Sequence, residues 1–353
     1  MTCFKNANLN GEMVDIVVEN GKISDIGRFD CDGVDLNGLR VFAGLVDIHA
    51  HGVIGYDTMD GNRLCEMSKY LAQNGTTSWL PTTMTVSLDD IKKAVNIKLP
   101  ETYGANVLGF HLEGPYISPK HKGAQNEEFI RELDIDEFRS LQNIRIITLA
   151  PEKSGSAEFI KNCGAVVSIG HTDADYEQSK KAIENGAMCL THTFNAMKPL
   201  KHREPGPVGA AIEKNIYVQV ICDGLHIHKS VIKMLYKTFG VDRMILISDS
   251  MRATGLGDGN YEFGGLPITV ENSIAKTEDG AIAGSTSTLF TCVKKAIEFG
   301  IPVSDAFKMA SETPSKLIGV KKGKIEKGYD ADFIAIDNDY NIKYSVVGGK
   351  IVE

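Results

Sequence analysis

The stretch Val41-Phe-Ala-Gly-Leu-Val-Asp-Ile-His49-Ala-His51 is the strongest indication of the fold, because it joins a short apolar run to two histidines that could bind a metal. Seven more apolar runs follow it, and several also end in a residue that can bind a metal or move a proton. The third run ends at Glu113, the fifth at His171, the sixth at His192 and the eighth at Asp249. Core packing does not select such residues, whereas barrel enzymes carry their chemistry at the C-terminal ends of successive strands.

The eight runs alternate with helical patterns, and this alternation indicates the fold class. Repeated strand–helix alternation predicts an α/β fold, namely a (β/α)8 TIM barrel. A doubly wound sheet is the alternative, but it needs a glycine-rich phosphate loop after the first strand, where this chain has His49-Ala-His51. The predicted strands lie near residues 44–50, 77–82, 106–112, 145–150, 166–170, 188–192, 217–222 and 244–249, and the predicted helices cover residues 62–74, 89–98, 176–185, 229–239 and, interrupted at Ser311–Pro314, 298–319.

The two ends of the chain differ from the middle. Asp15–Glu19 and Gly21–Gly27 alternate apolar and polar residues around a turn at Asn20-Gly21, and the last thirty or so residues, roughly from Lys324, repeat this style. We therefore expect a small β-sandwich domain formed from both chain termini, by residues 1–42 and 320–353. This domain would flank a catalytic barrel at residues 43–319.

Composition narrows the class of protein. The chain has 353 residues and a net charge of −8, which argues against nucleic acid as a partner. No apolar run is long enough to span a bilayer, and the N-terminus lacks the apolar stretch of a secretory signal. The seven cysteines form no Cys-x-x-Cys pair, so we expect free thiols in a reducing cytosol. These features predict a cytoplasmic protein that acts on a small molecule and has no membrane partner.

The histidines and acidic residues at the run ends predict a divalent metal site. His49 and His51 are two residues apart, so in a strand both point to the same face. Glu113 ends a run that should enter the core, and a buried carboxylate needs a partner such as a metal ion. His171 and His192 each follow an apolar run, and neutral imidazole is a common ligand of zinc and iron. Each histidine alone is more often a structural, hydrogen-bonded residue, but the five together favour a metal.

The residue types also predict the kind of chemistry. Glu113 with His171 and His192 gives three protein ligands and leaves a position for water, which is typical of a catalytic metal site. A divalent ion lowers the pKa of its water to about 7. Asp249 is placed to take a proton from that water and pass it to a leaving group, so it is the candidate general acid and base. A helix N-cap is the alternative role for Asp249.

Several motifs spread over nearly the whole chain resemble those of a known family. Gly44-Leu-Val-Asp-Ile-His-Ala-His-Gly52 and Gly323-Lys-Ile-Glu-Lys-Gly-Tyr-Asp-Ala-Asp332 are typical of the amidohydrolase superfamily. His111-Leu-Glu-Gly-Pro-Tyr116 and Thr191-His-Thr-Phe-Asn-Ala-Met197 are more specific, and they resemble the N-acetylglucosamine-6-phosphate deacetylase family. This resemblance implies metal-dependent hydrolysis of the acetamide of N-acetylglucosamine 6-phosphate to glucosamine 6-phosphate and acetate, in amino-sugar catabolism.

The resemblance also assigns the site residues. It implies that Glu113, His171 and His192 hold the main ion, zinc or iron, and that Asp249 is the catalytic acid and base. Because some members replace the first His-x-His and this chain keeps it, a second ion at His49 and His51, bridged by Glu113, is expected. The resemblance thus implies one or two ions per subunit, an amino-sugar phosphate as the small-molecule partner, and a homodimer.

The same resemblance to the deacetylase family also implies which residues bind the substrate. It implies that Asn195 and Ala196 present backbone N–H groups to the phosphate, and that Arg203, in a proline-rich loop that reaches across a dimer interface, binds it in a fork. His226 would contact the sugar, while His202 and His228 would lie at the surface or behind the site. Ala124 and Gln125 would line the acetyl group, but Gln125 stands where some members have a histidine that polarises the carbonyl. We therefore expect the Gln125 amide or the metal to stabilise the oxyanion.

Other functions remain open from the sequence. N-acetylgalactosamine-6-phosphate deacetylase differs only in contacts to one hydroxyl of the substrate. A deaminase or cyclic amidase on the same barrel would need no phosphate pocket. A non-catalytic barrel would be expected to lose its metal ligands and Asp249 first, and this chain keeps them all.

Overall fold

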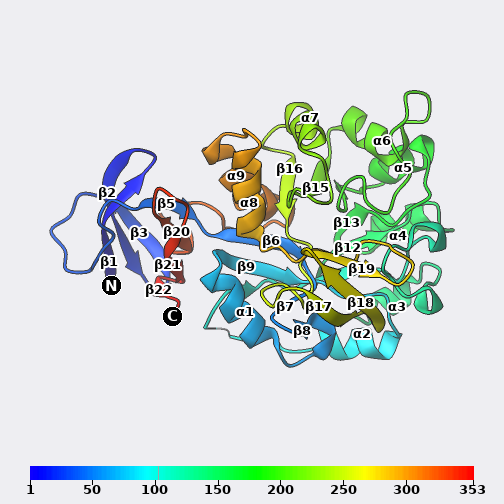
Figure 1. Ribbon diagram of the computed structural model, residues 1–353, viewed down its shortest axis with the longest axis horizontal. Helices are drawn as coiled ribbons and strands as arrows, with labels where there is room; N and C mark the ends of the chain where they lie inside the picture. Colours follow the sequence, from blue (N-terminus) through cyan, green and yellow to red (C-terminus); the bar gives the residue numbers. More distant parts are fainter. Residues whose placement is uncertain (102) are drawn as a thin grey trace.

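Parallel strands arranged in a ring form the centre of the computed structural model, which describes residues 1–101 and 103–353 (Figure 1). They pair in the orders β10-β9-β6 and β11-β12-β13-β14-β15-β16. Parallel bridges between Thr82 and His111 and between Ala50 and Ser250 connect the two sheets at both edges. The strands are β6 (Leu45–Ala50), β9 (Thr76–Pro81), β10 (Asn106–Val107) continued by β11 (Phe110–Glu113), β12 (Ile144–Leu149), β13 (Val166–Ile169), β14 (Cys189–Leu190), β15 (Tyr217–Ile221) and β16 (Met244–Ile247).

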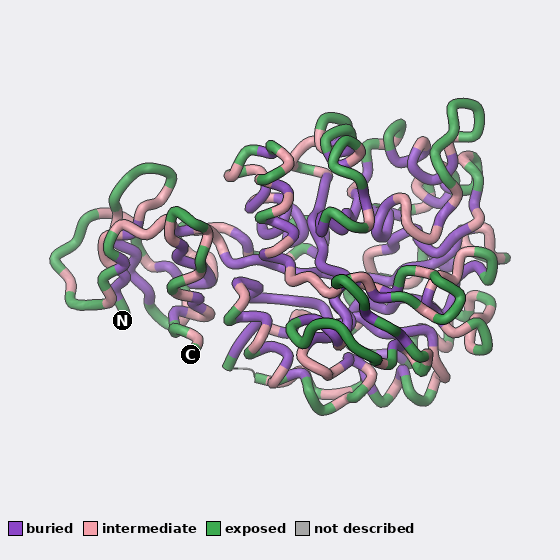
Figure 2. Tube along the Cα trace, viewed as in Figure 1, coloured by how far each residue is buried: buried purple, intermediate pink, exposed green. Residues whose placement is uncertain are grey.

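Each predicted apolar run forms a strand of this barrel, so the predicted (β/α)8 TIM barrel is confirmed. β6 and β9 are buried along their whole length, and Figure 2 shows buried chain running through the strands. Helices cover the outer side, which explains why the strands are apolar on both faces. The helices are α1 (Leu64–Gln73), α2 (Leu88–Val95), α3 (Ile135–Arg139), α4 (Ser156–Asn162), α5 (Tyr176–Glu184), α6 (Gly206–Lys214), α7 (Lys229–Phe239), α8 (Leu289–Glu298), α9 (Val303–Met309) and α10 (Glu312–Leu317).

Both ends of the chain contribute to a second, curled sheet, which lies to the left of the barrel in Figure 1. Its order is β22-β21-β20-β5-β1-β2-β3, with β4 on β1, and the Asn20-Gly21 turn joins β2 to β3 as expected. Phe4 and Phe333, 329 positions apart in the sequence, pack edge to face with ring centroids 4.9 Å apart. The strands are β1 (Thr2–Leu9), β2 (Glu12–Glu19), β3 (Lys22–Gly27), β4 (Val34–Asp35), β5 (Arg40–Ala43), β20 (Phe333–Ile336), β21 (Ile342–Val347) and β22 (Lys350–Ile351). We retain the division into residues 1–42 with 320–353 and residues 43–319 as a proposal.

Three segments differ from what the sequence predicts. A three-stranded antiparallel sheet, β17 (Gly259–Phe263), β18 (Leu266–Glu271) and β19 (Ile274–Thr277), follows the last barrel strand and was not expected. The predicted helix at 298–319 is α9 and α10, and Pro314 lies in the first turn of α10, where the missing N–H costs no intrahelical bond. Strands β7 (Gly52–Val53) and β8 (Tyr56–Asp57) pair directly after the His-x-His motif.

The expectation that the cysteines are free thiols is wrong for one pair. Cys3 on β1 and Cys31 in the segment after β3 form a disulfide, with their Cα atoms 6.4 Å apart. The two residues are 28 positions apart in the sequence, and the β1–β2–β3 meander folds the chain back so that they meet. Cysteine spacing alone does not reveal a contact that depends on strand pairing.

The described helices are short. The longest, α7, has 11 residues, and no described helix is both long and apolar enough to cross a membrane.

Replacement of Phe333 by alanine should test how far the curled sheet depends on its aromatic core. Phe333 is fully buried, so Phe333→Ala should lower the free energy of unfolding by about 3–5 kcal/mol through lost burial and a cavity. Chemical denaturation followed by circular dichroism measures this loss. The control Phe29→Ala removes an aromatic ring that is 39% exposed and should cost no more than about 0.5 kcal/mol. Equal losses for both variants would contradict this account of the core.

Candidate metal centre

Five potential metal ligands and one further carboxylate meet at the C-terminal ends of the barrel strands. His49 lies in β6 and His51 directly after it, while Glu113 is the last residue of β11. His171, His192 and Asp249 each follow a strand by two residues, after β13, β14 and β16. The sequence placed all six at strand ends, and the closed barrel brings those ends to one face. All six side chains are buried.

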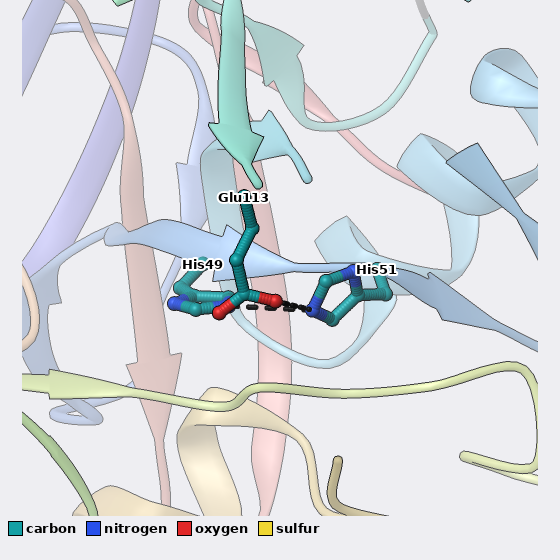
Figure 3. A group of neighbouring side chains, drawn as sticks. All are labelled: His49, His51 and Glu113. Carbon is teal, nitrogen blue, oxygen red and sulfur yellow. Dashed lines mark hydrogen bonds and ion pairs between the residues drawn. The ribbon is translucent and has the colours of Figure 1, made fainter. Parts of the chain in front are cut away.

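The first group consists of His49, His51 and Glu113. Figure 3 shows the Glu113 carboxylate descending from its strand between the two imidazoles. The Glu113 Oε1 atom lies 3.3 Å from His49 Nε2, and Oε2 lies 3.2 Å from His51 Nε2. The two Nε2 atoms are 3.3 Å apart. One ligand atom of each residue therefore falls within the span of a single ion.

The second group shares Glu113 and adds His171 and His192. Glu113 Oε1 lies 3.0 Å from His192 Nε2 and 3.3 Å from His171 Nε2, and these two nitrogens are 3.1 Å apart. Glu113 thus belongs to both groups, as a bridging carboxylate would. This arrangement matches the ligand set that the sequence predicted for one or two ions.

Hydrogen bonds behind the histidines show which ring nitrogen faces the centre. Nδ1 of His51 lies 3.2 Å from the Thr82 carbonyl, and Nδ1 of His171 lies 2.9 Å from the His121 carbonyl. Because a carbonyl oxygen only accepts, each Nδ1 carries the hydrogen and donates. The Nε2 of each neutral ring then points its lone pair at the centre, which is how such partners orient metal-binding histidines. Lone pairs and carboxylate oxygens at about 3 Å repel one another unless a cation lies among them.

Electrostatics at the centre also favour a cation. Burial acts to raise the pKa of Glu113, but the imidazoles of His49 and His171 outweigh it and hold that pKa well below its usual range. Burial acts to lower the pKa of His51, but Asp249 and Glu113 outweigh it and raise that pKa to about 10. The buried carboxylates of Glu113 and Asp249 are therefore stable only with positive charge beside them, which either protons or a metal ion can supply. Metal binding would release those protons.

Asp249 lies beside the first group. Its Oδ1 is 3.3 Å from both His49 Nε2 and His51 Nε2, and its backbone N–H donates to the His49 carbonyl at 2.9 Å. Burial acts to raise the pKa of Asp249, but the neighbouring histidines, His49 first, lower it overall. Asp249 is not an N-cap in this structure, because no described helix begins there. Its carboxylate is therefore available to chemistry in the pocket.

Three of these residues have a left-handed backbone. The φ angles of His171, His192 and Asp249 are 46°, 23° and 50°. Non-glycine residues rarely adopt this conformation, and such strain is concentrated at functional sites. A sharp turn directly after the strand directs each side chain over the barrel mouth.

A cavity of about 330 Å³ opens above the centre, and most predicted substrate residues line it. Ala124, Gln125, Asn195, Ala196 and His226 all lie on its wall, together with Asp249 and the ligands apart from His49. Arg203 does not line it. That residue is exposed, as are His202 and His228, and it borders a separate depression near α5 and α6.

His226 is held by Asp223 at the edge of the cavity. His226 Nδ1 lies 2.7 Å from Asp223 Oδ2, and the other ring nitrogen is left for the pocket. Burial acts to lower the pKa of His226, but the hydrogen bond and charge of Asp223 raise it overall. Burial acts to raise the pKa of Asp223, but His226 lowers it overall. Asp223 therefore favours the protonated form of His226 and orients its ring toward the pocket.

Sequence reasoning missed two residues that shape the site. Phe263, on the unpredicted β17, lines the cavity, and its ring centroid lies 5.0 Å from that of His51. Gln219 is fully buried in β15, and its Oε1 lies 3.0 Å from His49 Nδ1. A polar residue at the centre of an apolar run was the signal available for Gln219. Nothing in the local sequence indicated Phe263, because it follows the last barrel strand.

A barrel mouth that brings together a shared glutamate, four histidines and a neighbouring aspartate is the site of a metal-dependent hydrolase. The family model described as the amidohydrolase family matches residues 40–352. The N-acetylglucosamine-6-phosphate deacetylase of Vibrio furnissii is 37% identical over 95% of this chain and 90% of its own length, and that of Bacillus subtilis is 39% identical over 87% and 83%. The crystal structure of the same deacetylase from Pasteurella multocida superposes with a TM-score of 0.92 at 32% identity and covers 99% of both chains. The chain therefore belongs to the amidohydrolase family and, within it, to the N-acetylglucosamine-6-phosphate deacetylases.

The Asp223–His226 pair can be tested by titration. In the Asp223→Asn variant, His226 loses the hydrogen bond and the charge that raise its pKa, so its imidazole should lose its proton at a lower pH than in the wild type. Histidine NMR spectra recorded against pH measure this change, and the His226→Asn spectrum identifies the signal. An unchanged titration would show that Asp223 does not hold the charge of His226.

Proposed function

We propose that this protein hydrolyses the acetamide of N-acetylglucosamine 6-phosphate and releases acetate and glucosamine 6-phosphate, a step of amino-sugar catabolism. The convergence of Glu113 with four imidazole nitrogens, 3.0–3.3 Å away, next to Asp249 is the observation that carries the proposal. The Vibrio furnissii and Bacillus subtilis relatives, 37% and 39% identical, are N-acetylglucosamine-6-phosphate deacetylases, whereas an Escherichia coli relative at 34% identity is the deacetylase of the galacto epimer. The substrate is a small anion, in keeping with a pocket of about 330 Å³.

The residues present fit a divalent ion. We propose zinc or iron, because imidazole and carboxylate ligands suit both, and two ions, because two groups of three ligands share Glu113. Glu113, His171 and His192 would hold one ion, and His49, His51 and Glu113 the other. When bound, such an ion supplies Lewis acidity that lowers the pKa of water and polarises an amide carbonyl.

Asp249 would move the proton. Its pKa lies below the usual range, so the carboxylate is ionised at neutral pH and can accept a proton from the attacking water. The same oxygen can then donate this proton to the nitrogen of the departing amine. Both steps need Asp249 close to the ligands, and its Oδ1 lies 3.3 Å from two of them.

Residues on the pocket wall would position the substrate. His226 would contact the sugar or the oxyanion through the ring nitrogen that Asp223 leaves free. The backbone N–H of Asn195 donates to the His192 carbonyl at 2.9 Å, so at this turn, where Ala196 has φ 49°, the Ala196 N–H would face the phosphate. Anchoring at the phosphate would hold the acetamide over the ions, which lowers the entropic cost of reaching the transition state.

Arg203 supports the proposal of a homodimer. The residue is exposed and lies outside its own pocket, so it does not reach a phosphate bound there. We propose that it enters the pocket of a second subunit and binds the phosphate there. We also propose a cytoplasmic location, because a phosphorylated sugar is charged and does not partition into a bilayer.

Acetate release from a panel of substrates tests the function. N-acetylglucosamine 6-phosphate should be the best substrate, ahead of its galacto epimer and of unphosphorylated N-acetylglucosamine, and a chelator should abolish turnover. Arg203→Ala should raise KM for the phosphorylated sugar about tenfold or more, because a charged hydrogen bond is lost, while the neighbouring Lys201→Ala should not. Release of ammonia instead of acetate would replace the proposal with a deaminase, and a preference for the galacto epimer would reassign the substrate.

The role of Asp249 has a separate test. Asp249→Asn keeps the shape of the side chain but removes the proton acceptor, so kcat should fall about 100- to 10,000-fold. Metal content, measured by elemental analysis with inductively coupled plasma mass spectrometry, should remain that of the wild type. Asp89→Asn, on the exposed surface of α2, is the matched control and should keep full activity. Turnover at the wild-type rate in Asp249→Asn would remove this residue from the mechanism.

A further inference from the structure

Gln125 has an amide whose orientation the backbone determines. The side chain is buried, and its Oε1 accepts a hydrogen bond from the Thr85 backbone N–H at 2.7 Å. Because a backbone N–H only donates, the atom facing it must be the oxygen. The Nε2 group therefore faces Glu113, and it donates to Glu113 Oε2 at 2.7 Å.

Both hydrogens of this amide have partners. One goes to Glu113 Oε2, and Nε2 also lies 4.0 Å from Met84 Sδ, a weak acceptor. No N–H of Gln125 is left for an oxyanion in the pocket. This geometry differs from the role in carbonyl activation that the sequence led us to expect, although Gln125 does line the cavity.

The hydrogen bond from Gln125 affects which histidines each carboxylate oxygen of Glu113 faces. Oε1 faces His171 and His192 and also lies 3.3 Å from His49 Nε2, so Oε2, which faces His51, would be the oxygen left for a second ion. Rotation about the last side-chain bond of a glutamate has a broad minimum, so the carboxylate plane is not fixed by the side chain itself. The 2.7 Å hydrogen bond from Gln125 to Oε2 fixes that plane and keeps Oε2 on the side of His51.

We propose that Gln125 is a positioning residue that holds Glu113 across the two ligand groups, so that both groups bind an ion. The inference rests on the proposed metal-dependent function, because it assumes that these groups are metal ligands. Loss of the Gln125 donor leaves Oε1 with His171 and His192, so that group keeps its three ligands. The group of His49 and His51 loses the oriented oxygen, and its ion is the one affected. Partners behind metal ligands typically change affinity about 10- to 100-fold.

Metal content measured against a graded chelator tests the proposal. The wild type should retain two ions per chain, and Gln125→Leu should retain one with wild-type affinity and bind the second about 10- to 100-fold more weakly. Gln125→Met is close to glutamine in shape and carries no N–H donor or charge, so it should show the same loss and serves if the leucine variant fails to fold. Gln142→Leu makes the same change at an exposed position and should match the wild type.

Other outcomes are distinguishable. A wild type that binds one ion, or variants that hold two ions at wild-type affinity, would overturn the proposal. A fall in acetate release with unchanged metal binding would assign Gln125 to the substrate instead. If the wild type binds two ions but releases no acetate from any substrate, the proposed function fails while the role of Gln125 stands.

Discussion

The buried carboxylate of Glu113 is the constraint on which the rest of the site depends. An ionised carboxylate away from water is stable only if positive charge or hydrogen bonds compensate it. Glu113 has four imidazole nitrogens within 3.3 Å and one amide donor at 2.7 Å, which come from different strands and loops. The barrel must therefore close for this charge to be tolerated. Site and fold stabilise each other through this residue.

The precision of the centre comes from groups behind the ligands. Carbonyl oxygens of Thr82 and His121 fix the hydrogens of His51 and His171, and the Gln219 side chain does so for His49. All three acceptors belong to the barrel interior or to a loop that starts at a barrel strand. Orientation is thus set by elements that are already rigid, which limits reorganisation when an ion or substrate binds.

Much of this arrangement could be predicted from the sequence, for a physical reason. Strands that are buried on both faces appear in the sequence as apolar runs. The C-terminal ends of parallel strands lie on one face of the barrel, so residues that are far apart in the sequence can be grouped by their position at strand ends. Contacts that depend on chain reversal could not be predicted this way. The Cys3–Cys31 disulfide, the position of Phe263 beside His51 and the bond between Gln125 and Glu113 all arise from strand pairing or loop paths that carry no local signal.

The charge of the substrate is the physical reason for proposing a second subunit at the site. A phosphate monoester carries about −1.5 to −2 charge at neutral pH, and among the described residues no lysine or arginine lines the cavity. His226, with its raised pKa, and the backbone near Ala196 offer partial compensation. Arg203 lies in the loop after Met197, where it is exposed and lines a different depression. In the proposed homodimer, a second copy of the chain would supply the missing cation without any change in the barrel, because residues 199–204, which include Arg203, are exposed.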